Sequence, residues 1–365
     1  MSQLRIAVIG AGHLGRIHAK LLGSVDGAQL VGISDPFEQA RATASELYQV
    51  PVHADYRDLI PEIDAAIIAA PTDSHAKITR DLLKAGKHVF VEKPLTIDRS
   101  DATQLAALAG AKQLTLQVGH VERFNPAFTA LGDLAVDVKY VEAVRASRFP
   151  GRCLDVGVVM DLMIHDLDLV LSFTDAPIRW ISASGLSVVS GHEDIAETRI
   201  EFECGMVANL KASRVSPEAA RQMQVFGSNG FAEIDFGQPS LSLIKPSRDL
   251  TDRTFDLDEQ ADSPLGYADE LFTDKLSAET IELSPRNAIL DELHDFVISI
   301  QSGSAPTVDG VAGARAVDIA QRILESIEER KWYSNAKTSE IGPHAFPRQR
   351  VENAPQRSFG IRRAA

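Results

Sequence analysis

The chain of 365 residues contains only two cysteines, Cys153 and Cys204, which form neither a CxxC pair nor a metal-ligand cluster. Such sparse thiols give no disulfide framework and are typical of a reducing compartment, so we expect a cytoplasmic protein. The sequence also lacks an apolar run of the roughly 18 residues that a membrane span requires. Its N-terminus has neither the basic flank nor the apolar core of a signal peptide. We therefore expect no membrane role.

Positive charge is scarce as well, because 37 lysines and arginines face 51 aspartates and glutamates, for a net charge of −14. Nucleic-acid phosphates are bound by clustered lysine and arginine, so this balance argues against a general nucleic-acid surface. It does not exclude a small anionic ligand, which a few local arginines or a helix N-terminus can hold. We expect a small-molecule substrate and no nucleic-acid partner.

The first 120 residues alternate short apolar runs with amphipathic segments. The apolar runs are RIAVIG, AQLVGISD, DAAIIAAP, KHVFVEKP and LTLQVGH. Strands that alternate with helices form parallel sheets, and strands that are apolar throughout are covered by helices on both faces. The pattern predicts an α/β domain over residues 1–122.

The rest of the chain has a different order of predicted helices and strands. A strong helical pattern at 155–173 is followed by strand-like runs without helices between them, which predicts a mainly antiparallel sheet in a second α/β domain over 123–334. Its later elements are an acidic excursion at 249–285 and two helices near 287–302 and 311–331. Residues 335–365 carry prolines and arginines with few apolar anchors, and we expect a mobile tail there.

A glycine-rich turn in GxGxxG spacing directly follows the first apolar run and opens a helical pattern. It contains Gly10, Gly12, His13, Leu14 and Gly15. Such a turn lets the backbone approach a pyrophosphate, which the N–H groups of the following helix then bind. We therefore predict a Rossmann dinucleotide-binding domain. Related turns bind FAD or S-adenosylmethionine, so this motif alone leaves those cofactors open.

An acidic residue favours NAD among the possible cofactors. Asp35 ends the second strand, twenty positions after Gly15, and no arginine follows it immediately. A carboxylate at this place accepts hydrogen bonds from a ribose 2′-hydroxyl and repels a 2′-phosphate. We expect NAD rather than NADP.

Polar side chains follow three of the predicted strands at their carboxyl ends, where open α/β sheets bind ligands. In chain order they are Pro71, Thr72 and His75, then Glu92 and Lys93, then His120. We expect these residues to face the cofactor, with Lys93 at the nicotinamide end. The alternatives are an exposed ion pair between Lys93 and Glu92, and a His120 that only ends its strand. Pro94 predicts a cis peptide bond that would fix the direction of Lys93.

The helical pattern at 155–173 carries a polar stripe on an otherwise apolar helix. Asp161, His165, Asp168 and Ser172 lie at i, i+4, i+7 and i+11 and share one face. A polar stripe on a buried helix needs polar partners or a solvent-filled cleft. One interpretation is a structural Asp–His pair. A metal site would need a third ligand that the spacing does not provide, so none is predicted.

Together these motifs resemble the glucose-fructose oxidoreductase/inositol dehydrogenase (Gfo/Idh/MocA) family. They are GxGxxG, Asp35, the EKP of Glu92 to Pro94, and DLMIH preceded by Gly157. The resemblance extends to about residue 335 and implies a Rossmann domain followed by an α/β domain with an open-faced sheet. It also implies oligomer contacts through that sheet, so we expect a homodimer or homotetramer. By the same resemblance, Lys93, Asp161 and His165 match the family's catalytic set.

These residue types suit hydride transfer from a sugar carbon to the nicotinamide. His165 suits the base that removes the hydroxyl proton, because an ordinary histidine pKa of about 6.5 lies near working pH. Lys93 could stabilise the developing alkoxide, and Asp161 could orient the imidazole. The sequence leaves open whether His165 or Lys93 is the base.

The stretch VGHVERFNPA, with the helix above, is similar to bacterial dehydrogenases that oxidise C3 of UDP-linked N-acetylhexosamines or their uronic acids. The implied next enzyme is a PLP-dependent aminotransferase. Arg123 and Asn125 follow the fifth predicted strand and could bind sugar hydroxyls or a phosphate. Arg123 could instead tie the two domains together. Two other functions remain open: a dehydrogenase or reductase of a free sugar, inositol or small carbonyl compound, and a non-catalytic sensor of NAD(H) or sugar.

Overall fold

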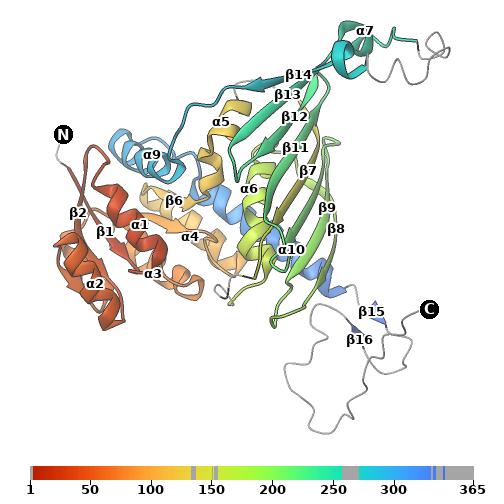
Figure 1. Ribbon diagram of the computed structural model, residues 1–365. Helices are drawn as coiled ribbons and strands as arrows, with labels where there is room; N and C mark the ends of the chain where they lie inside the picture. Colours follow the sequence, from red (N-terminus) through yellow and green to blue (C-terminus); the bar gives the residue numbers. More distant parts are fainter. Residues whose placement is uncertain are drawn as a thin grey trace.

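Two large β-sheets lie side by side in the protein, each with helices packed against it (Figure 1). The computed structural model describes residues 3–132, 137–149, 151, 155–256, 271–329, 332–333 and 340–341. No helix in these ranges is long and apolar enough to cross a membrane.

The first sheet has six parallel strands in the order β3-β2-β1-β4-β5-β6. The strands are β1 (Leu4–Ile9), β2 (Ala28–Ser34), β3 (Val52–His53), β4 (Ala65–Ile68), β5 (His88–Glu92) and β6 (Leu116–Gly119). The helices between them are α1 (His13–Leu22), α2 (Glu38–Tyr48), α3 (Thr72–Lys84) and α4 (Arg99–Lys112). Interior residues of β1, β4 and β5 are buried whichever face they point to, because helices cover both faces. The predicted Rossmann sheet is confirmed.

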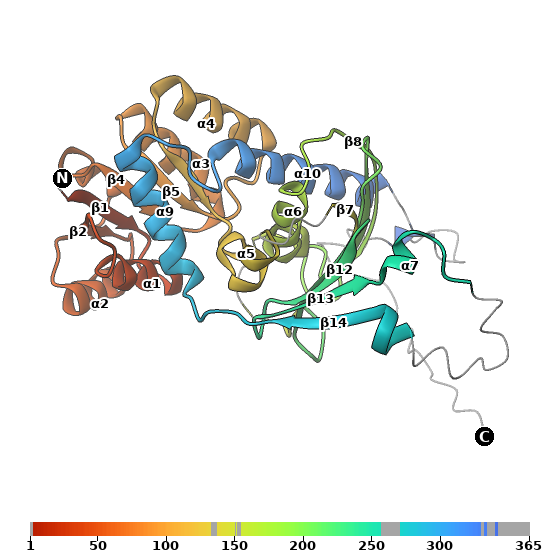
Figure 2. The same ribbon diagram turned by 90° about the horizontal axis from the view of Figure 1, so that it is seen from above.

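The second sheet has eight strands in the order β14-β13-β12-β11-β7-β10-β9-β8, and only the β7–β10 pair is parallel. The strands are β7 (Val138–Ala146), β8 (Ile178–Leu186), β9 (Ile195–Phe202), β10 (Val207–Ser213), β11 (Ala220–Gly227), β12 (Gly230–Asp235), β13 (Ser240–Pro246) and β14 (Leu276–Ile281). Helices α5 (Pro126–Gly132), α6 (Ile164–Leu171) and α10 (Gly310–Glu329) lie along one face (Figure 2).

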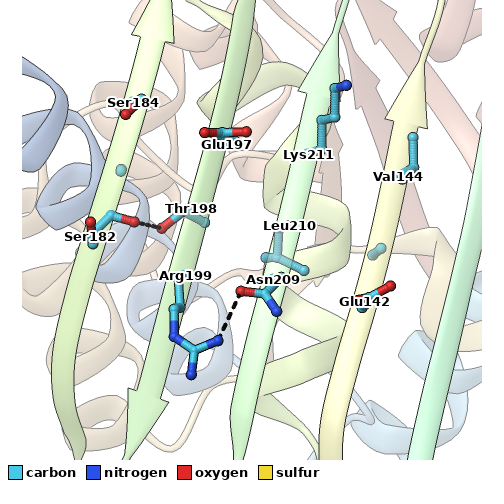
Figure 3. Close-up of a pocket in the computed structure, with 12 residues that line it drawn as sticks. Glu142, Val144, Ser182, Ser184, Glu197, Thr198, Arg199, Asn209, Leu210 and Lys211 are labelled. Carbon is cyan, nitrogen blue, oxygen red and sulfur yellow. Dashed lines mark hydrogen bonds between the residues drawn. The ribbon is translucent and has the colours of Figure 1, made fainter.

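The other face of the second sheet is open, as predicted. Polar side chains such as Glu142, Arg199, Asn209 and Lys211 project from it, as Figure 3 shows. Arg199 donates a hydrogen bond to Asn209, and Asn209 donates one to Tyr140. This face is hydrophilic, and no helix of the described part of the chain covers it. Alternate residues of the same strands pack into the core on the other side.

The two predicted C-terminal helices are confirmed and connect the two sheets. Helix α9 (Ala288–Ser302) packs against α1 and buries Leu293 and Phe296 beside the first sheet. The backbone N–H of Val118 then donates to the carbonyl of Val308 at 3.0 Å, which places the start of α10 against β6. Helix α10 continues along β8. The division at residue 122 remains a prediction, but α9 belongs physically with the first sheet.

The predicted continuous helix at 155–173 differs from the structure. A π-helical turn at Val159–Met163 precedes α6, and its start is held by Glu193, whose carboxylate accepts a hydrogen bond from the Val159 backbone N–H at 3.2 Å. Gly157 packs directly against the Glu193 side chain, where a larger residue would not fit. The helical pattern could not reveal this turn, because π-helices are short and rare.

Other predictions concern the last third of the chain. Part of the excursion expected at 249–285 forms the short helix α7 (Arg248–Thr251), a π-helical turn at Leu271–Lys275 and the edge strand β14. Residues 257–270 lie outside the described ranges. Most of the tail predicted at 335–365 also lies outside them, apart from β16 (Glu340–Ile341), which pairs with β15 (Trp332–Tyr333).

Candidate active site

The glycine-rich turn between β1 and α1 fits a pyrophosphate. Gly10 has a φ of 100° and approaches the carbonyl oxygen of Ala69, and a side chain at Gly15 would collide with the carbonyl of Gly10. A side chain at Gly12 would meet no atom within 4 Å, so open space lies over this residue. That space faces the N-terminal end of α1, which begins at His13. The turn therefore fits the dinucleotide that the sequence predicts.

The Asp35 carboxylate is fixed beside this turn. It accepts hydrogen bonds from the backbone N–H groups of Ala11 at 2.8 Å and Phe37 at 2.9 Å, one to each oxygen. A carboxylate oxygen has a second lone pair, so each can accept a further bond from a ribose hydroxyl. The charge held here opposes a 2′-phosphate, in agreement with NAD.

His75, which was predicted to face the cofactor, makes contacts within the protein. The buried His75 ring lies 2.8 Å from the Pro94 carbonyl and 2.9 Å from the Ala70 carbonyl, and so links the ends of β4 and β5. Pro71 and Thr72 lie where α3 begins. The predicted cis bond between Lys93 and Pro94 is confirmed.

The Lys93 side chain crosses from the first sheet to the second domain. Its Nζ donates to the backbone carbonyl of Asp161 at 2.7 Å and to the Asp161 carboxylate at 2.9 Å. Both side chains are about 15% exposed, so the pair lies at the edge of solvent. An ammonium group has three N–H donors, and these contacts leave one for a substrate oxygen.

Two histidines lie beside this ion pair with unused ring nitrogens. The rings of His165 and His120 are 6.4 Å apart. Within the described chain, Nδ1 of His165 and both ring nitrogens of His120 are buried without a hydrogen-bond partner. Burial lowers the pKa of His165 well below its ordinary value, and the positive charges of Lys93 and Arg145 lower it further. His165 is therefore neutral at neutral pH and can accept a proton.

Asp161 was expected to orient the imidazole of His165, but it contacts Lys93. Its carboxylate holds the ammonium of Lys93, and among the described residues no hydrogen bond joins it to His165. The spacing of four residues placed Asp161 on the same helix face as His165, but it could not show that β5 supplies a closer partner. The expectation that Asp161 orients His165 receives no support from this geometry.

Arg123 and Asn125 also make their main contacts within the protein. Arg123 donates to both oxygens of Asp168, at 2.7 and 3.3 Å, and thereby joins the 3-10 helix Val121–Phe124 to α6. Both residues lie in the predicted second domain, so this contact does not itself tie the two domains together. The buried amide of Asn125 donates to Glu122 and accepts from the Ala127 backbone N–H, so it organises the start of α5.

A buried arginine that the sequence did not single out holds the same region. Arg145 on β7 donates to Glu122 at 2.7 Å and to both oxygens of Asp166, the closest contact being 2.7 Å. Asp166 lies off the polar stripe of the helix and forms a salt bridge with Arg145. Glu122 and Asp166 stand among apolar residues in the sequence, which was the only sign that a buried cation binds them. No local motif indicated that this cation is Arg145 on a strand.

Glu92 points into a buried cluster rather than into open space. Its carboxylate lies 2.7 Å from Nε2 of His18. Glu292 of α9 contributes a third group, and the ligand atoms of the three side chains lie within 4.8 Å of one another. Burial and the charge of Glu92 raise the pKa of Glu292 well above its ordinary value. One oxygen of Glu292 has no partner in the described chain, so a retained proton is the simplest way to keep this site neutral.

Loss of Arg145 should destabilise the fold strongly. Arg145→Met leaves the buried carboxylates of Glu122 and Asp166 without their cation, which costs about 3–5 kcal/mol of unfolding free energy. Urea denaturation measures the change. Arg199→Met removes an exposed ion pair and should cost at most about 1 kcal/mol. Equal losses in the two variants would contradict the account.

The retained proton of Glu292 predicts a pH-dependent stability difference. Because the folded-state pKa is raised, the folded protein keeps a proton that the unfolded chain loses, and wild-type stability falls as pH rises from about 4.5 towards that pKa. The glutamine of Glu292→Gln cannot ionise. The difference between the Tm of this variant and the Tm of the wild type should therefore increase as pH rises through this range. Thermal unfolding by circular dichroism at several pH values measures the gain, and the exposed Glu325→Gln should show none.

A Glu292→Gln variant that is less stable than the wild type at every pH would refute the retained proton. A wild-type Tm that falls on addition of EDTA would also refute it, because His18, Glu92 and Glu292 would then hold a cation.

Comparisons with known proteins agree with the fold and with a dinucleotide-binding first domain. The model of the oxidoreductase family with an NAD-binding Rossmann fold, GFO_IDH_MocA, matches residues 4–120, and the GFO/IDH/MocA C-terminal domain matches residues 136–233. The UDP-N-acetylglucosamine 3-dehydrogenase of Acidithiobacillus ferrooxidans is 34% identical over 330 residues, which cover 90% of this chain and 98% of that protein. The myo-inositol 2-dehydrogenase of Thermotoga maritima is 27% identical and covers 90% of this chain and 97% of its own.

Solved structures give the same result. The crystal form P21 of UDP-N-acetylglucosamine 3-dehydrogenase GnnA from A. ferrooxidans superposes with a TM-score of 0.78 at 32% identity and covers 90% of this chain and 99% of that chain. Levoglucosan dehydrogenase in complex with NADH superposes with a TM-score of 0.77 at 17% identity, covering 90% and 98%, and shows the shared fold. The chain therefore belongs to the Gfo/Idh/MocA family of NAD-dependent oxidoreductases.

Proposed function

We propose that the protein oxidises the C3 hydroxyl of a UDP-linked N-acetylhexosamine, with NAD as the hydride acceptor. The observation that carries the proposal is the contact between Lys93 and Asp161 beside a neutral, unpartnered His165. The similarity to a UDP-N-acetylglucosamine 3-dehydrogenase over 90% of the chain supports this substrate class.

The residues divide the work of this reaction between them. NAD, when bound over the glycine-rich turn and Asp35, supplies the acceptor for the hydride that leaves the sugar carbon. Lys93 uses its remaining N–H to hold the hydroxyl oxygen and to stabilise negative charge that develops on it. Asp161 fixes the direction of the ammonium. His165 accepts the hydroxyl proton at Nδ1 or Nε2, because its lowered pKa keeps the ring neutral.

Inositol is the main alternative substrate. The myo-inositol 2-dehydrogenase of T. maritima covers as much of the chain, at 27% identity. A free sugar or inositol would use the same Lys93, Asp161 and His165, so these residues do not separate the two functions. A non-catalytic sensor is a third reading, and the close contact of Lys93 with Asp161 beside His165 speaks against it.

The proposal extends to partners. Oxidation at C3 gives a ketone, which a PLP-dependent aminotransferase can consume. We propose that such an enzyme uses the product in the cytoplasm, and that two or four copies of the chain associate through the open face of the second sheet (Figure 3). Light scattering of the purified protein measures the number of copies.

Substitution of either catalytic residue should abolish turnover. The purified protein is incubated with NAD and, separately, with UDP-N-acetylglucosamine, its uronate, inositols and free sugars, and NADH absorbance is followed. We expect a signal with the nucleotide sugars. Lys93→Ala and His165→Ala should each lower kcat by at least about 100-fold, because each removes a group that acts on the transferred proton or the alkoxide.

The control is Lys84→Ala, which removes an exposed lysine at the C-terminal end of α3. NAD binding, measured by calorimetry, should be unchanged in all three variants. Wild-type turnover in Lys93→Ala or His165→Ala would refute the mechanism. A signal with inositol alone would select the alternative substrate, and no signal with any sugar would favour the sensor.

A further inference from the structure

An exposed arginine on β11 faces the active-site side of the second sheet. Side chains alternate along a strand, and Met223 and Val225 of β11 belong to the core beneath the helices. Arg221 has the same parity, so it points to that side. It lies directly opposite Arg145 in the register of β7 and β11. Its backbone carbonyl accepts a hydrogen bond from Phe236 at 2.8 Å, which fixes its place at the start of the strand.

The guanidinium of Arg221 has no partner among the residues that the structure describes. Within the described ranges it makes no hydrogen bond and no ion pair, although it is exposed at a point where acids are close. Those acids are occupied: both oxygens of Asp166 accept from Arg145, and the oxygens of Glu122 accept from Arg145 and Asn125. The N–H donors of Arg221 are therefore not used by these acids and stay available to an anionic ligand.

The position of Arg221 links it to the catalytic residues. After burial and the charges of Lys93, Arg145 and His120, its charge also lowers the pKa of His165. It acts on Asp166 in the same direction. Arg145, directly opposite Arg221, binds Asp166, which follows His165 in the chain. Arg221 is therefore exposed to solvent on one side and lies near the imidazole on the other. A ligand that reaches both residues would have its reacting carbon near His165 and an anionic group beyond it.

We propose that Arg221 binds the diphosphate of the nucleotide-linked substrate and so selects nucleotide sugars over free sugars and inositols. This inference rests on the proposed function, whose substrate class it makes specific to one residue. A guanidinium presents a planar fork of N–H donors that matches two phosphate oxygens. The chain has a net charge of −14, so an arginine without an ion pair beside the active site is a place where an anion can bind.

The test compares Arg221→Gln and Arg221→Lys with the wild type, using UDP alone and UDP-N-acetylglucosamine as probes in the presence of NAD. Arg221→Gln should weaken UDP binding, measured by calorimetry, by about 10- to 100-fold, as expected for lost charge-assisted hydrogen bonds. KM for UDP-N-acetylglucosamine should rise by a similar factor, while kcat and the affinity for NAD are kept. Arg221→Lys should recover part of the loss.

A second readout separates binding from a purely structural role. Removing the charge of Arg221 raises the pKa of His165, so the acid limb of the kcat profile should move to higher pH in Arg221→Gln and stay near the wild-type position in Arg221→Lys. The matched control is Arg179→Gln, an exposed arginine on β8 at the far edge of the same sheet. It should change neither UDP binding nor the profile.

The outcomes for the subsite and for the proposed function are distinct. Wild-type UDP binding in Arg221→Gln, or a wild-type protein that does not bind UDP, would overturn the subsite even if a sugar is oxidised. UDP binding that is lost in Arg221→Gln while no UDP-sugar is oxidised would support the subsite and refute the proposed reaction.

Discussion

The contact between Lys93 and Asp161 is the interaction on which the active site depends. Lys93 ends a strand of the first sheet and Asp161 lies in the π-helical turn before α6, so one ion pair sets the position of the two domains at the reacting atoms. The bond to the Asp161 carbonyl fixes the ammonium in two directions and leaves its third donor open. His165, one helical turn further on, then has a neutral ring beside that donor.

Buried ion pairs of Arg145 and Arg123 hold the segments that carry these residues. Arg145 forms ion pairs with Glu122 and Asp166, and Arg123 forms one with Asp168, so the segment after β6 and helix α6 are fixed to each other and to β7. An ion pair of this kind is costly to bury and more costly to break, and it specifies one geometry. Burial lowers the pKa of His165 well below its ordinary value, and the charge of Arg145 lowers it further. Arg145 thus both holds α6 in place and acts on the proposed base.

Local motifs predicted the fold and supplied the candidate catalytic residues, whereas contacts between distant segments could not be predicted. GxGxxG, the strand ends and the polar stripe depend on neighbours in sequence, so Gly12, Lys93 and His165 could be identified from their own segments. The partner of Asp161 could not, since it comes from a strand 68 positions away. Glu292 lies on α9, far along the chain from Glu92 and His18, and no spacing in the sequence indicates that α9 packs beside the first sheet.

The transfer of hydrogen from C3 of the sugar is the central claim, and an isotope measurement tests it most directly. UDP-N-acetylglucosamine with deuterium at C3 is incubated with the protein and NAD, and the NADH that forms is analysed by mass spectrometry and NMR. The account predicts that the deuterium is found at C4 of the nicotinamide. NADH that carries only ordinary hydrogen at C4, or a sugar that keeps its deuterium while NADH accumulates, would contradict it.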